Sequence, residues 1–402
     1  ATIDGNGLAT AIAIGSTSIH ATDGDISSNS AAMAVDNPLV SIAVTPTSAT
    51  IAPSATQQFT ATGTYSNNAT LNLSSAVTWN SSSATATIDA NGLATASTSA
   101  GVTSISASAD SIISNTASLT VASVENYAYV TNRNNNSVSY CLVNSTTGVL
   151  SNCAATGGSS FSFPTGIILN AAHTFAYITN LNGDTVSYCA VNSNGTLSNC
   201  QTAASGLASP YALTLNPAGT KLYVTNYNAN NVTYCTVNQS NGSLSACINT
   251  ASTGLISPVG IVFNSANTLA YIANYNGGGY VARCTVSQMD GALSDCSSTA
   301  SITRPVALTL NPAGTIAYVG GNTSKVYYCA VNQSTGALTC TANSQTFSLA
   351  YGVSVNLANT IAYIANLAND TVSQCTIGPG GMLTSCAATG SGFLGPFGIT
   401  VN

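Results

Sequence analysis

Cysteine is the residue type whose spacing points most directly to chemistry in this sequence. All twelve cysteines lie after residue 140, in six pairs whose members stand 11 or 12 residues apart. Segments such as "NSNG" separate the members of a pair, and Asn and Gly there can form a tight hairpin turn. Opposed residues of a hairpin lie within disulfide reach. We therefore predict six disulfides: Cys141–Cys153, Cys189–Cys200, Cys235–Cys247, Cys284–Cys296, Cys329–Cys340 and Cys375–Cys386.

A metal site would need ligands grouped closely in the sequence, such as CxxC with a second pair or with nearby histidines. The only histidines, His20 and His173, stand alone, and we expect neither a metal nor another cofactor. Paired cysteines are typical of oxidising compartments, so we expect an extracellular or cell-surface protein.

Hydrolytic catalysis needs a general base or a metal beside a group that stabilises negative charge. Asp184 and Asp370 occupy matching positions, where we interpret each as capping its own turn. Asp290 lies in a hairpin turn, and we expect Asp295 to form a surface ion pair with Arg283. No GxSxG, HExxH or phosphate loop occurs. Because the reactive groups are scattered, we predict no catalytic residue and a non-enzymatic protein; the candidates considered are Glu125, Arg133, His173, Asp184, Asp290, Asp295, Arg304 and Asp370.

The composition describes a polar surface with few charges. Of 402 residues, 45% are apolar and only 4% are charged, while Ser and Thr together number 108. The basic residues stand singly, which argues against nucleic-acid binding and against binding to anionic lipid; they are Arg133, Lys221, Arg283, Arg304 and Lys325. No run of 18 apolar residues occurs, so we expect no membrane insertion in this segment. The Asn-X-Ser/Thr triplets are as numerous as chance predicts, and they do not indicate whether glycans are attached.

The first part of the chain contains one and a half copies of a repeat. "ATIDGNGLAT" at residues 1–10 returns as "ATIDANGLAT" at 86–95, and residues 15–35 align without a gap with residues 101–121. Residues 1–35 thus correspond to the second half of a unit that is complete from about Leu39 to Val121. Its short alternating strands, separated by Gly, Asn and Pro, predict an immunoglobulin-like sandwich.

Residues 39–121 also resemble a known family. "SIAVTP", "QQFTATGTY", the strand around Trp79 and "IDANGLAT" follow one another as in the group 2 bacterial immunoglobulin-like domain. The resemblance implies a cell-surface spacer or adhesin module that usually occurs in tandem arrays. We expect Phe59 and Trp79 to anchor its core. The expected domains are residues 1–35 (a half domain), 36–121 (a complete domain) and 122–402.

The rest of the chain follows a period of 45 to 48 residues, marked by tyrosines within strands such as "AYVTN" and "AYITN". Such a period with about four strands per unit predicts a β-propeller. The "YVTN" strands resemble the YVTN family of lactonase-like propellers. We count six blades, and because the first lacks an inner strand, we expect the last five residues, Gly398–Asn402, to supply it. The inner strands end in asparagines that either form turns or line a glycan or ion site at a channel mouth: Asn170, Asn216, Asn264, Asn311, Asn356 and Asn402.

Residues 1–35 are too few to bury the apolar side chains of half a sandwich. These side chains are Ile3, Leu8, Ile14, Ile19, Ile26, Met33 and Val35. Either the natural polypeptide continues upstream into further immunoglobulin-like repeats, or Ala1 is a processed end and another subunit donates the missing strands. Donation of that kind would build a polymer.

These inferences favour an all-β, exported surface protein, with immunoglobulin-like sandwiches followed by a six-bladed propeller that the C-terminal strand closes. We expect it to be a structural subunit of an extracellular fibre, or an adhesin. The alternative from another class is a lactonase-like or glycan-processing enzyme that uses the propeller's channel mouth. A third hypothesis is a glycan-binding module displayed on immunoglobulin-like spacers.

Overall fold

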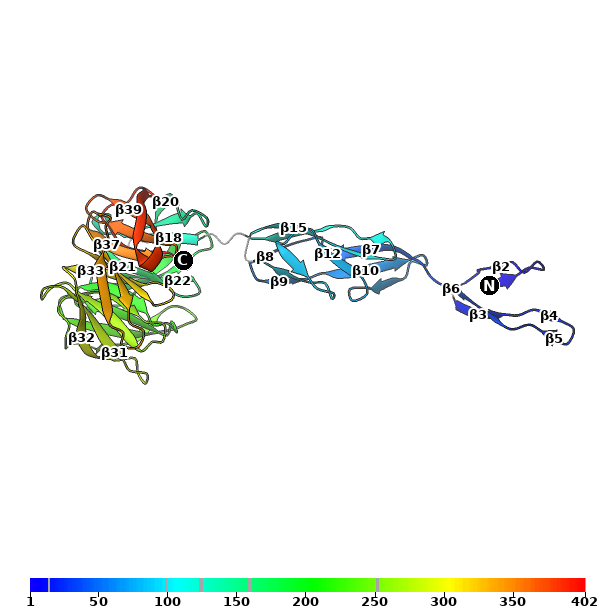
Figure 1. Ribbon diagram of the computed structural model, residues 1–402, viewed down its shortest axis with the longest axis horizontal. Coiled ribbons are helices and arrows are strands. Elements are labelled where there is room, and N and C mark those ends of the chain that lie inside the picture. Colours follow the sequence, from blue (N-terminus) through cyan, green and yellow to red (C-terminus); the bar gives the residue numbers. More distant parts are fainter. Residues whose placement is uncertain (14, 98–99, 123–125, 158–160, 251–252, 402) are drawn as a thin grey trace. The chain divides into compact units, whose positions relative to one another are not determined.

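Short β-strands joined by turns and loops form the described chain (Figure 1). The computed structural model describes residues 1–13, 15–97, 100–122, 126–157, 161–250 and 253–401. Two three-residue 3₁₀ turns, η1 (Arg133–Asn135) and η2 (Pro379–Gly381), interrupt the strands. Among the described residues, no helix has the length and apolar character that a membrane span requires. The chain divides into two compact units, Ala1–Val124 and Glu125–Asn402.

The complete sandwich consists of sheets that enclose one apolar core. In β15, every second side chain from Thr103 to Ala107 is buried, as expected for a strand with one face on a core. Phe59 is fully buried, and the Trp79 indole donates to the Ser74 carbonyl at 2.8 Å beside the same core. Both aromatic residues thus anchor this domain, as predicted. Its strands are β7 (Leu39–Thr45), β8 (Ser48–Ile51), β9 (Thr56–Gln58), β10 (Thr60–Tyr65), β11 (Thr70–Asn72), β12 (Thr78–Ser81), β13 (Ala86–Ile88), β14 (Leu93–Ala96), β15 (Gly101–Ala109), β16 (Ile112–Ile113) and β17 (Ala117–Val121).

Residues 1–35 form three hairpins that repeat the registers of residues 86–121. The strands are β1 (Thr2–Ile3), β2 (Ala9–Thr10), β3 (Gly15–Ile19), β4 (Thr22–Asp23), β5 (Ile26–Ser27) and β6 (Ala31–Val35). In β3–β6, Thr17 pairs with Met33, just as Thr103 pairs with Leu119 in β15–β17. The burial differs, because Leu119 is fully buried whereas Met33 is only half-buried. Ile14 lies outside the described residues.

The edges of these hairpins also differ from those of the complete domain. There, β12 extends the sheet along β15, and β8 runs parallel to β17. Within the described residues, no strand takes the place of β12 or β8 beside β3 and β6, which pair only with each other. Ile3, Leu8 and Ile26 are consequently 52%, 67% and 78% exposed.

Six four-stranded antiparallel sheets follow in the described residues, each a blade of a propeller. Each inner strand contacts the inner strands of both neighbouring blades, which closes a ring. Blade 1 contains β18 (Asn126–Asn132), β19 (Ser137–Val143), β20 (Leu150–Thr156) and β41 (Pro396–Val401); blade 2 β21 (Pro164–Leu169), β22 (Phe175–Asn180), β23 (Thr185–Val191) and β24 (Leu197–Ala204); blade 3 β25 (Pro210–Leu215), β26 (Lys221–Asn226), β27 (Asn231–Val237) and β28 (Leu244–Thr250). Blade 4 contains β29 (Pro258–Phe263), β30 (Leu269–Asn274), β31 (Tyr280–Val286) and β32 (Leu293–Ser301); blade 5 β33 (Pro305–Leu310), β34 (Ile316–Gly321), β35 (Val326–Val331) and β36 (Leu338–Ala342); blade 6 β37 (Ala350–Val355), β38 (Ile361–Asn366), β39 (Thr371–Ile377) and β40 (Leu383–Thr389).

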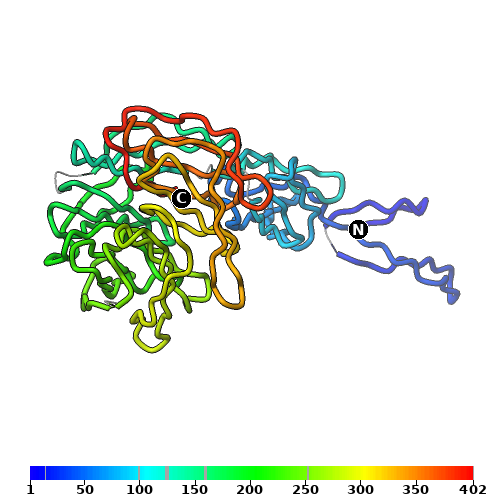
Figure 2. The backbone as a smooth tube through the Cα atoms, turned by 60° about the vertical axis from the view of Figure 1, so that its left-hand side comes forward, coloured from blue at the N-terminus to red at the C-terminus, as the bar shows by residue number. Residues whose placement is uncertain are grey.

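The C-terminal strand completes blade 1, as the sequence predicts. Ala128 pairs with Val401 and Val130 with Ile399, so the two ends of the propeller join within one sheet. In Figure 2 the red C-terminal strand lies beside the teal segment that begins the propeller. The pairing leaves no open edge at the closure of the ring.

The tyrosines of the second strands join neighbouring blades. Five of the six hydroxyls donate to a glycine carbonyl in the outer hairpin of the next blade at 2.7–2.9 Å: Tyr129 to Gly195, Tyr177 to Gly242, Tyr223 to Gly291, Tyr271 to Gly336 and Tyr363 to Gly148. The sixth, Tyr318, is also fully buried, but its hydroxyl has no partner among the described residues. The "YVTN" motif is therefore part of the seams between blades.

The inner strands approach one another closely because small residues face the neighbouring strand. A Cβ atom added at Gly398 would lie 2.2 Å from the Thr165 carbonyl oxygen, and one at Gly352 would lie 2.3 Å from that of Phe397. Such distances leave room only for glycine at these two positions.

The cysteines form six disulfides in the predicted pairs. Each bond joins the third and fourth strands of one blade, with Cα atoms 3.9–4.1 Å apart. The bonds hold the outer hairpin of every blade closed.

Candidate functional site

Every blade begins its inner strand with the same backbone turn. The residue at the start has a positive φ between 46° and 62°: Phe163, Ser209, Ser257, Arg304, Leu349 and Gly395. Its carbonyl accepts the N–H of the residue that follows the second strand, as from Leu181 to Phe163 and from Tyr227 to Ser209. Because this backbone repeats, the side chains around it gather at one end of the channel, which we call the mouth.

Asp184 and Asp370 hold this turn in place. The Asp184 carboxylate accepts the backbone N–H of Ser209 at 2.8 Å, and Asp370 accepts that of Gly395 at 2.6 Å. Asn136 and Asn230 make the same bond to the turns of blades 2 and 4. The expectation that the two aspartates cap their own turns is wrong, since each caps the first turn of the next blade. Neither lines a cavity of the mouth.

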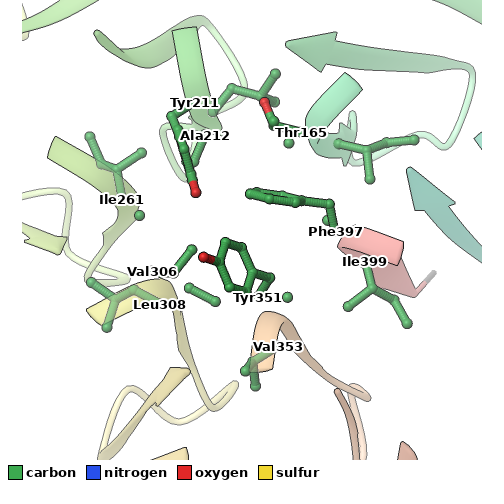
Figure 3. A pocket seen from close by; sticks show the side chains of 17 residues that line it. Thr165, Tyr211, Ala212, Ile261, Val306, Leu308, Tyr351, Val353, Phe397 and Ile399 are labelled. Atoms are coloured by element: carbon green, nitrogen blue, oxygen red, sulfur yellow. The ribbon is translucent and has the colours of Figure 1, made fainter. Parts of the chain in front are cut away.

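Aromatic side chains fill the mouth. In Figure 3, Tyr211, Tyr351 and Phe397 project from three inner strands toward the centre of the channel. The Phe397 ring centroid lies 5.2 Å from that of Tyr211 and 4.7 Å from that of Tyr351. Tyr227 stacks on Tyr211 at 5.9 Å, and Tyr275 follows at 6.3 Å from Tyr227. We call these five rings the aromatic arc.

Two cavities meet at the arc. One, of about 90 Å³, lies within the channel and is lined by residues of the inner strands of all six blades. The other, of about 340 Å³, is lined by Tyr211, Tyr227, Tyr275 and Tyr351, together with Leu181, Asn182, Ser209 and Asn228. Tyr211 and Tyr351 line both cavities and thus separate the channel from the wider space. A concave, mostly aromatic lining with a few polar groups is typical of small-molecule sites.

Polar groups border the arc. The Arg133 guanidinium carbon lies 4.1 Å from the ring centroid of Phe163 and 5.5 Å from that of Phe397. Arg304 lies 5.9 Å from the Tyr275 centroid. Two of the five lysine and arginine residues of the chain are therefore at the mouth.

Burial affects the pKa of two phenols of the arc. It raises the pKa of Tyr351 to about 12 and raises that of Tyr211 well above its usual value. In both cases the charge of Arg133 opposes the effect of burial on the pKa. At neutral pH, both hydroxyls can donate a hydrogen bond to a ligand.

Among the other candidates from the sequence, Asp290 lies in a hairpin turn and Asp295 lies in β32. The Asp290 carboxylate accepts the Ala292 N–H at 3.0 Å, and its pKa is lowered by the Ser287 hydroxyl and that N–H. The expected ion pair is wrong, because Asp295 accepts from the Ser294 hydroxyl and Arg283 donates to the Thr335 carbonyl. Glu125 lies outside the described residues.

The histidine and asparagine candidates show no site either. His173 lies in the turn that Asn170 begins, where its N–H donates to the Asn170 carbonyl. Within the described residues, no group of three His, Cys, Asp or Glu side chains could hold a metal. The Asn170 side chain accepts the N–H groups of Thr174 and Phe175, and its counterparts in blades 3 to 6 make equivalent turn bonds. Asn402 lies outside the described residues.

The residues that form the mouth were not identified from the sequence. The rings of the aromatic arc and Arg133 occupy two positions, the second residue of an inner strand or the residue directly after a second strand. From blade 1 to blade 6, the first position reads Phe397, Thr165, Tyr211, Val259, Val306 and Tyr351, and the second reads Arg133, Leu181, Tyr227, Tyr275, Asn322 and Leu367. Their variation beside neighbours that recur in most blades was the available signal.

Comparison with known sequences finds two families. Residues 39–121 match the bacterial Ig-like domain (group 2), and residues 119–263 match the family described as "Lactonase, 7-bladed beta-propeller". Ice-binding protein 1 of Shewanella frigidimarina is 46% identical over 81 residues, which are 20% of this chain and 9% of that protein. The all-β prediction of an immunoglobulin-like domain followed by a propeller is thus confirmed, although the matched family has seven blades and this structure has six four-stranded sheets in its described residues.

Solved structures share the propeller fold. A nidogen/laminin complex is 14% identical with a TM-score of 0.54, over 69% of this chain and 98% of that one. A protein of Bacteroides fragilis NCTC 9343 described as a 6-phosphogluconolactonase is 17% identical with a TM-score of 0.50, also over 69% and 98%. At these identities, the likeness extends to the fold alone.

The match to a lactonase family corrects one prediction. From the scattered reactive groups we expected a protein that is not an enzyme, but residues 119–263 are similar to a family of enzymes. The chain is similar to group 2 bacterial immunoglobulin-like domains in one part and to lactonase propellers in the other.

Proposed function

We propose that the propeller binds a sugar-derived ring, such as a sugar lactone, at its aromatic mouth, and that it acts there as a lactonase-like or glycan-processing enzyme. The observation that carries this proposal is the cavity of about 340 Å³ lined by four tyrosines. The match of residues 119–263 to lactonase propellers supports the same class of ligand.

The lining suits a carbohydrate. Aromatic rings offer flat apolar faces for the C–H faces of a sugar ring, and their hydroxyls remain available for hydrogen bonds. The side chains of Asn182 and Asn228 add amide groups at the rim. Asn228 already donates to the Ser209 hydroxyl at 2.6 Å, which fixes the orientation of its amide. Few polar groups among aromatic walls can orient a ring with several hydroxyls.

The mouth can also assist the opening of a lactone. Attack of water on the lactone carbonyl places negative charge on its oxygen, and preorganised donors stabilise that charge. Tyr211 and Tyr351 provide neutral hydroxyl donors; both line the cavity of about 340 Å³, and Figure 3 shows them projecting toward the centre of the channel. No carboxylate or imidazole belongs to the described lining of either cavity. Stabilisation of the developing oxyanion is therefore the contribution we assign to the mouth.

We place this activity outside the cell. Six disulfides are typical of proteins in an oxidising compartment. The immunoglobulin-like domain belongs to a type found as a surface spacer, and we propose that it displays the propeller.

The test is binding and turnover with a panel of sugars and sugar lactones. Calorimetric titration measures binding, and acid release measures hydrolysis. We expect the double variant Tyr227→Leu with Tyr275→Leu to weaken binding, because it removes two rings of the lining. The control is Tyr327→Leu, at a half-buried tyrosine of β35 that lines neither cavity. Absence of binding, or binding that the double variant leaves unchanged, would contradict the proposal.

A second candidate function is attachment through residues 1–35. The observation that favours it is that β3–β6 repeat the register of β15–β17, while the residues corresponding to that domain's core remain accessible. We propose that a polypeptide with the strand pattern of residues 39–85 completes this half domain, and that a surface assembly or polymer uses the contact.

This second proposal is testable with the full chain and a separate polypeptide of residues 39–85. Added strands should protect the backbone N–H groups of β3 and β6 from hydrogen exchange. The variant Met33→Asp should lose that protection, since Met33 corresponds to the fully buried Leu119. Unchanged exchange in the original chain would contradict the proposal.

A further inference from the structure

Arg133 is held at the mouth in an unusual environment. It directly follows β18, and its backbone N–H donates to the Gly395 carbonyl at 3.0 Å. Its guanidinium lies 4.1 Å from the Phe163 centroid and 5.5 Å from the Phe397 centroid. Its Nε atom is buried and has no hydrogen-bond partner among the described residues. A buried charged donor without a partner is unfavourable, so its role is not explained by stability.

The other blades show that the fold does not need a cation at this position. The five equivalent residues are Leu181, Tyr227, Tyr275, Asn322 and Leu367, and each donates the same backbone hydrogen bond. The nearby Asp370 carboxylate already accepts the Gly395 N–H at 2.6 Å. No ion pair between Arg133 and an acidic side chain is present in the part of the chain that the structure describes.

Arg133 is not among the residues that line the two cavities; its guanidinium is connected to them through the Phe397 ring, which lines the channel cavity. Phe397 contacts both Arg133 and the phenols of Tyr211 and Tyr351. Its charge influences both phenols, since it opposes the effect of burial on their pKa values. Arg304 is exposed at the edge of the arc, next to Tyr275. Arg133 and Arg304 are thus the two cations at the mouth, where the carboxylates of Asp184 and Asp370 already accept backbone N–H groups of the turns.

We propose, resting on the function above, that the ligand is a sugar acid and that Arg133 binds its carboxylate. A planar guanidinium matches a carboxylate with two parallel hydrogen bonds. The neighbouring phenols supply further neutral donors. One half-buried arginine balances one negative charge, whereas a phosphate dianion would need a second such cation, and Arg304 is exposed. Carboxylate is therefore the anion that this mouth fits.

Calorimetric titration of the full chain with glucuronate, glucose and glucose 6-phosphate tests the assignment. We expect glucuronate to bind about 10- to 100-fold more tightly than glucose, the usual range for a charge-assisted hydrogen bond. Arg133→Gln should remove this preference and leave glucose binding unchanged. Arg133→Lys should retain part of it, because it keeps the charge without the planar fork. The control Lys325→Gln removes an equal charge from a residue whose Nζ donates to the Ser344 carbonyl at 3.5 Å.

A measurement on the unaltered protein makes the test independent of how the variants fold. Added NaCl should weaken glucuronate binding and leave glucose binding unchanged, because only the former involves a charge pair. Equal affinity for glucuronate and glucose would overturn the role assigned to Arg133, and so would a preference for glucuronate that Arg133→Gln retains. Neither result would contradict the proposed function. Tighter binding of glucose 6-phosphate would overturn the choice of carboxylate. If none of the three sugars binds, the proposed function fails together with this inference.

Discussion

The seams between the blades and the mouth of the channel follow opposite rules. At the seams, one chemical arrangement recurs, as in the tyrosine hydroxyls that bond to the next blade in five of six cases. At the mouth, an equally repetitive backbone carries side chains that differ from blade to blade, from Thr165 to Tyr211 to Val259. Repeated side chains therefore maintain the ring, and divergent ones are free to form a site. Substitutions should separate these two roles, with large effects on stability at the seams and rim and small ones at the mouth.

The largest loss of stability should follow removal of a disulfide. Replacing Cys189 and Cys200 together with alanine opens a loop of 11 residues, and the entropy regained by the unfolded chain should lower the free energy of unfolding by about 3 kcal/mol. Denaturant unfolding measures the change. An unchanged unfolding midpoint would mean that the rim of the blade contributes little to the stability of the ring.

A smaller loss should follow Gly398→Ala on the closing strand β41. The new Cβ would lie 2.2 Å from the Thr165 carbonyl oxygen, which forces the inner strands apart. Overpacking of this kind costs about 2 kcal/mol. Gly378→Ala is the control, because its Cβ would make only ordinary contact at 3.4 Å. Equal midpoints for the two variants in thermal unfolding would contradict the close packing of the channel wall.

The seams offer an internal comparison in two tyrosines that are both fully buried. Tyr129→Phe leaves the Gly195 carbonyl without its 2.8 Å donor and should destabilise the protein by about 1 kcal/mol. Tyr318→Phe removes a hydroxyl that has no partner among the described residues, so stability should stay the same or rise slightly. If both variants lose the same free energy of unfolding in denaturant, the hydrogen bonds at the seams do not explain why tyrosine recurs in every blade.

Periodicity explains why most of the fold was predictable. Each blade repeats its pattern within 45 to 48 residues, and each cysteine pair flanks its own turn. Local rules are sufficient for such features. The role of Asp184 was missed because its partner, Ser209, is 25 residues away in the next blade, a contact that turn chemistry alone does not indicate.

The candidate site was not predictable in the same way. Reactive groups do not cluster locally in the sequence, and from this we wrongly expected a protein without enzymatic activity. A propeller instead gathers one or two residues from each blade. Tyr211 and Tyr351 are 140 positions apart in the numbering, yet both line the same cavity. Only the closure of the ring brings them together.

The smallest effect on stability should come from Tyr227→Leu at the mouth. Leucine already stands at the equivalent positions of blades 2 and 6, as Leu181 and Leu367, with the same backbone hydrogen bond that Tyr227 donates to Ser209 at 3.1 Å. Within the described residues, the Tyr227 hydroxyl accepts one long bond, from Asn276 at 3.3 Å. We expect the free energy of unfolding to change by less than about 0.5 kcal/mol.

Loss of the stacked ring should weaken sugar binding by about 1 kcal/mol, or roughly fivefold, in calorimetric titration. A residue of the binding site must affect the affinity for the sugar more than it affects the free energy of unfolding. If Tyr227→Leu lowers stability and leaves the affinity for sugar unchanged, Tyr227 belongs to the scaffold and not to the site.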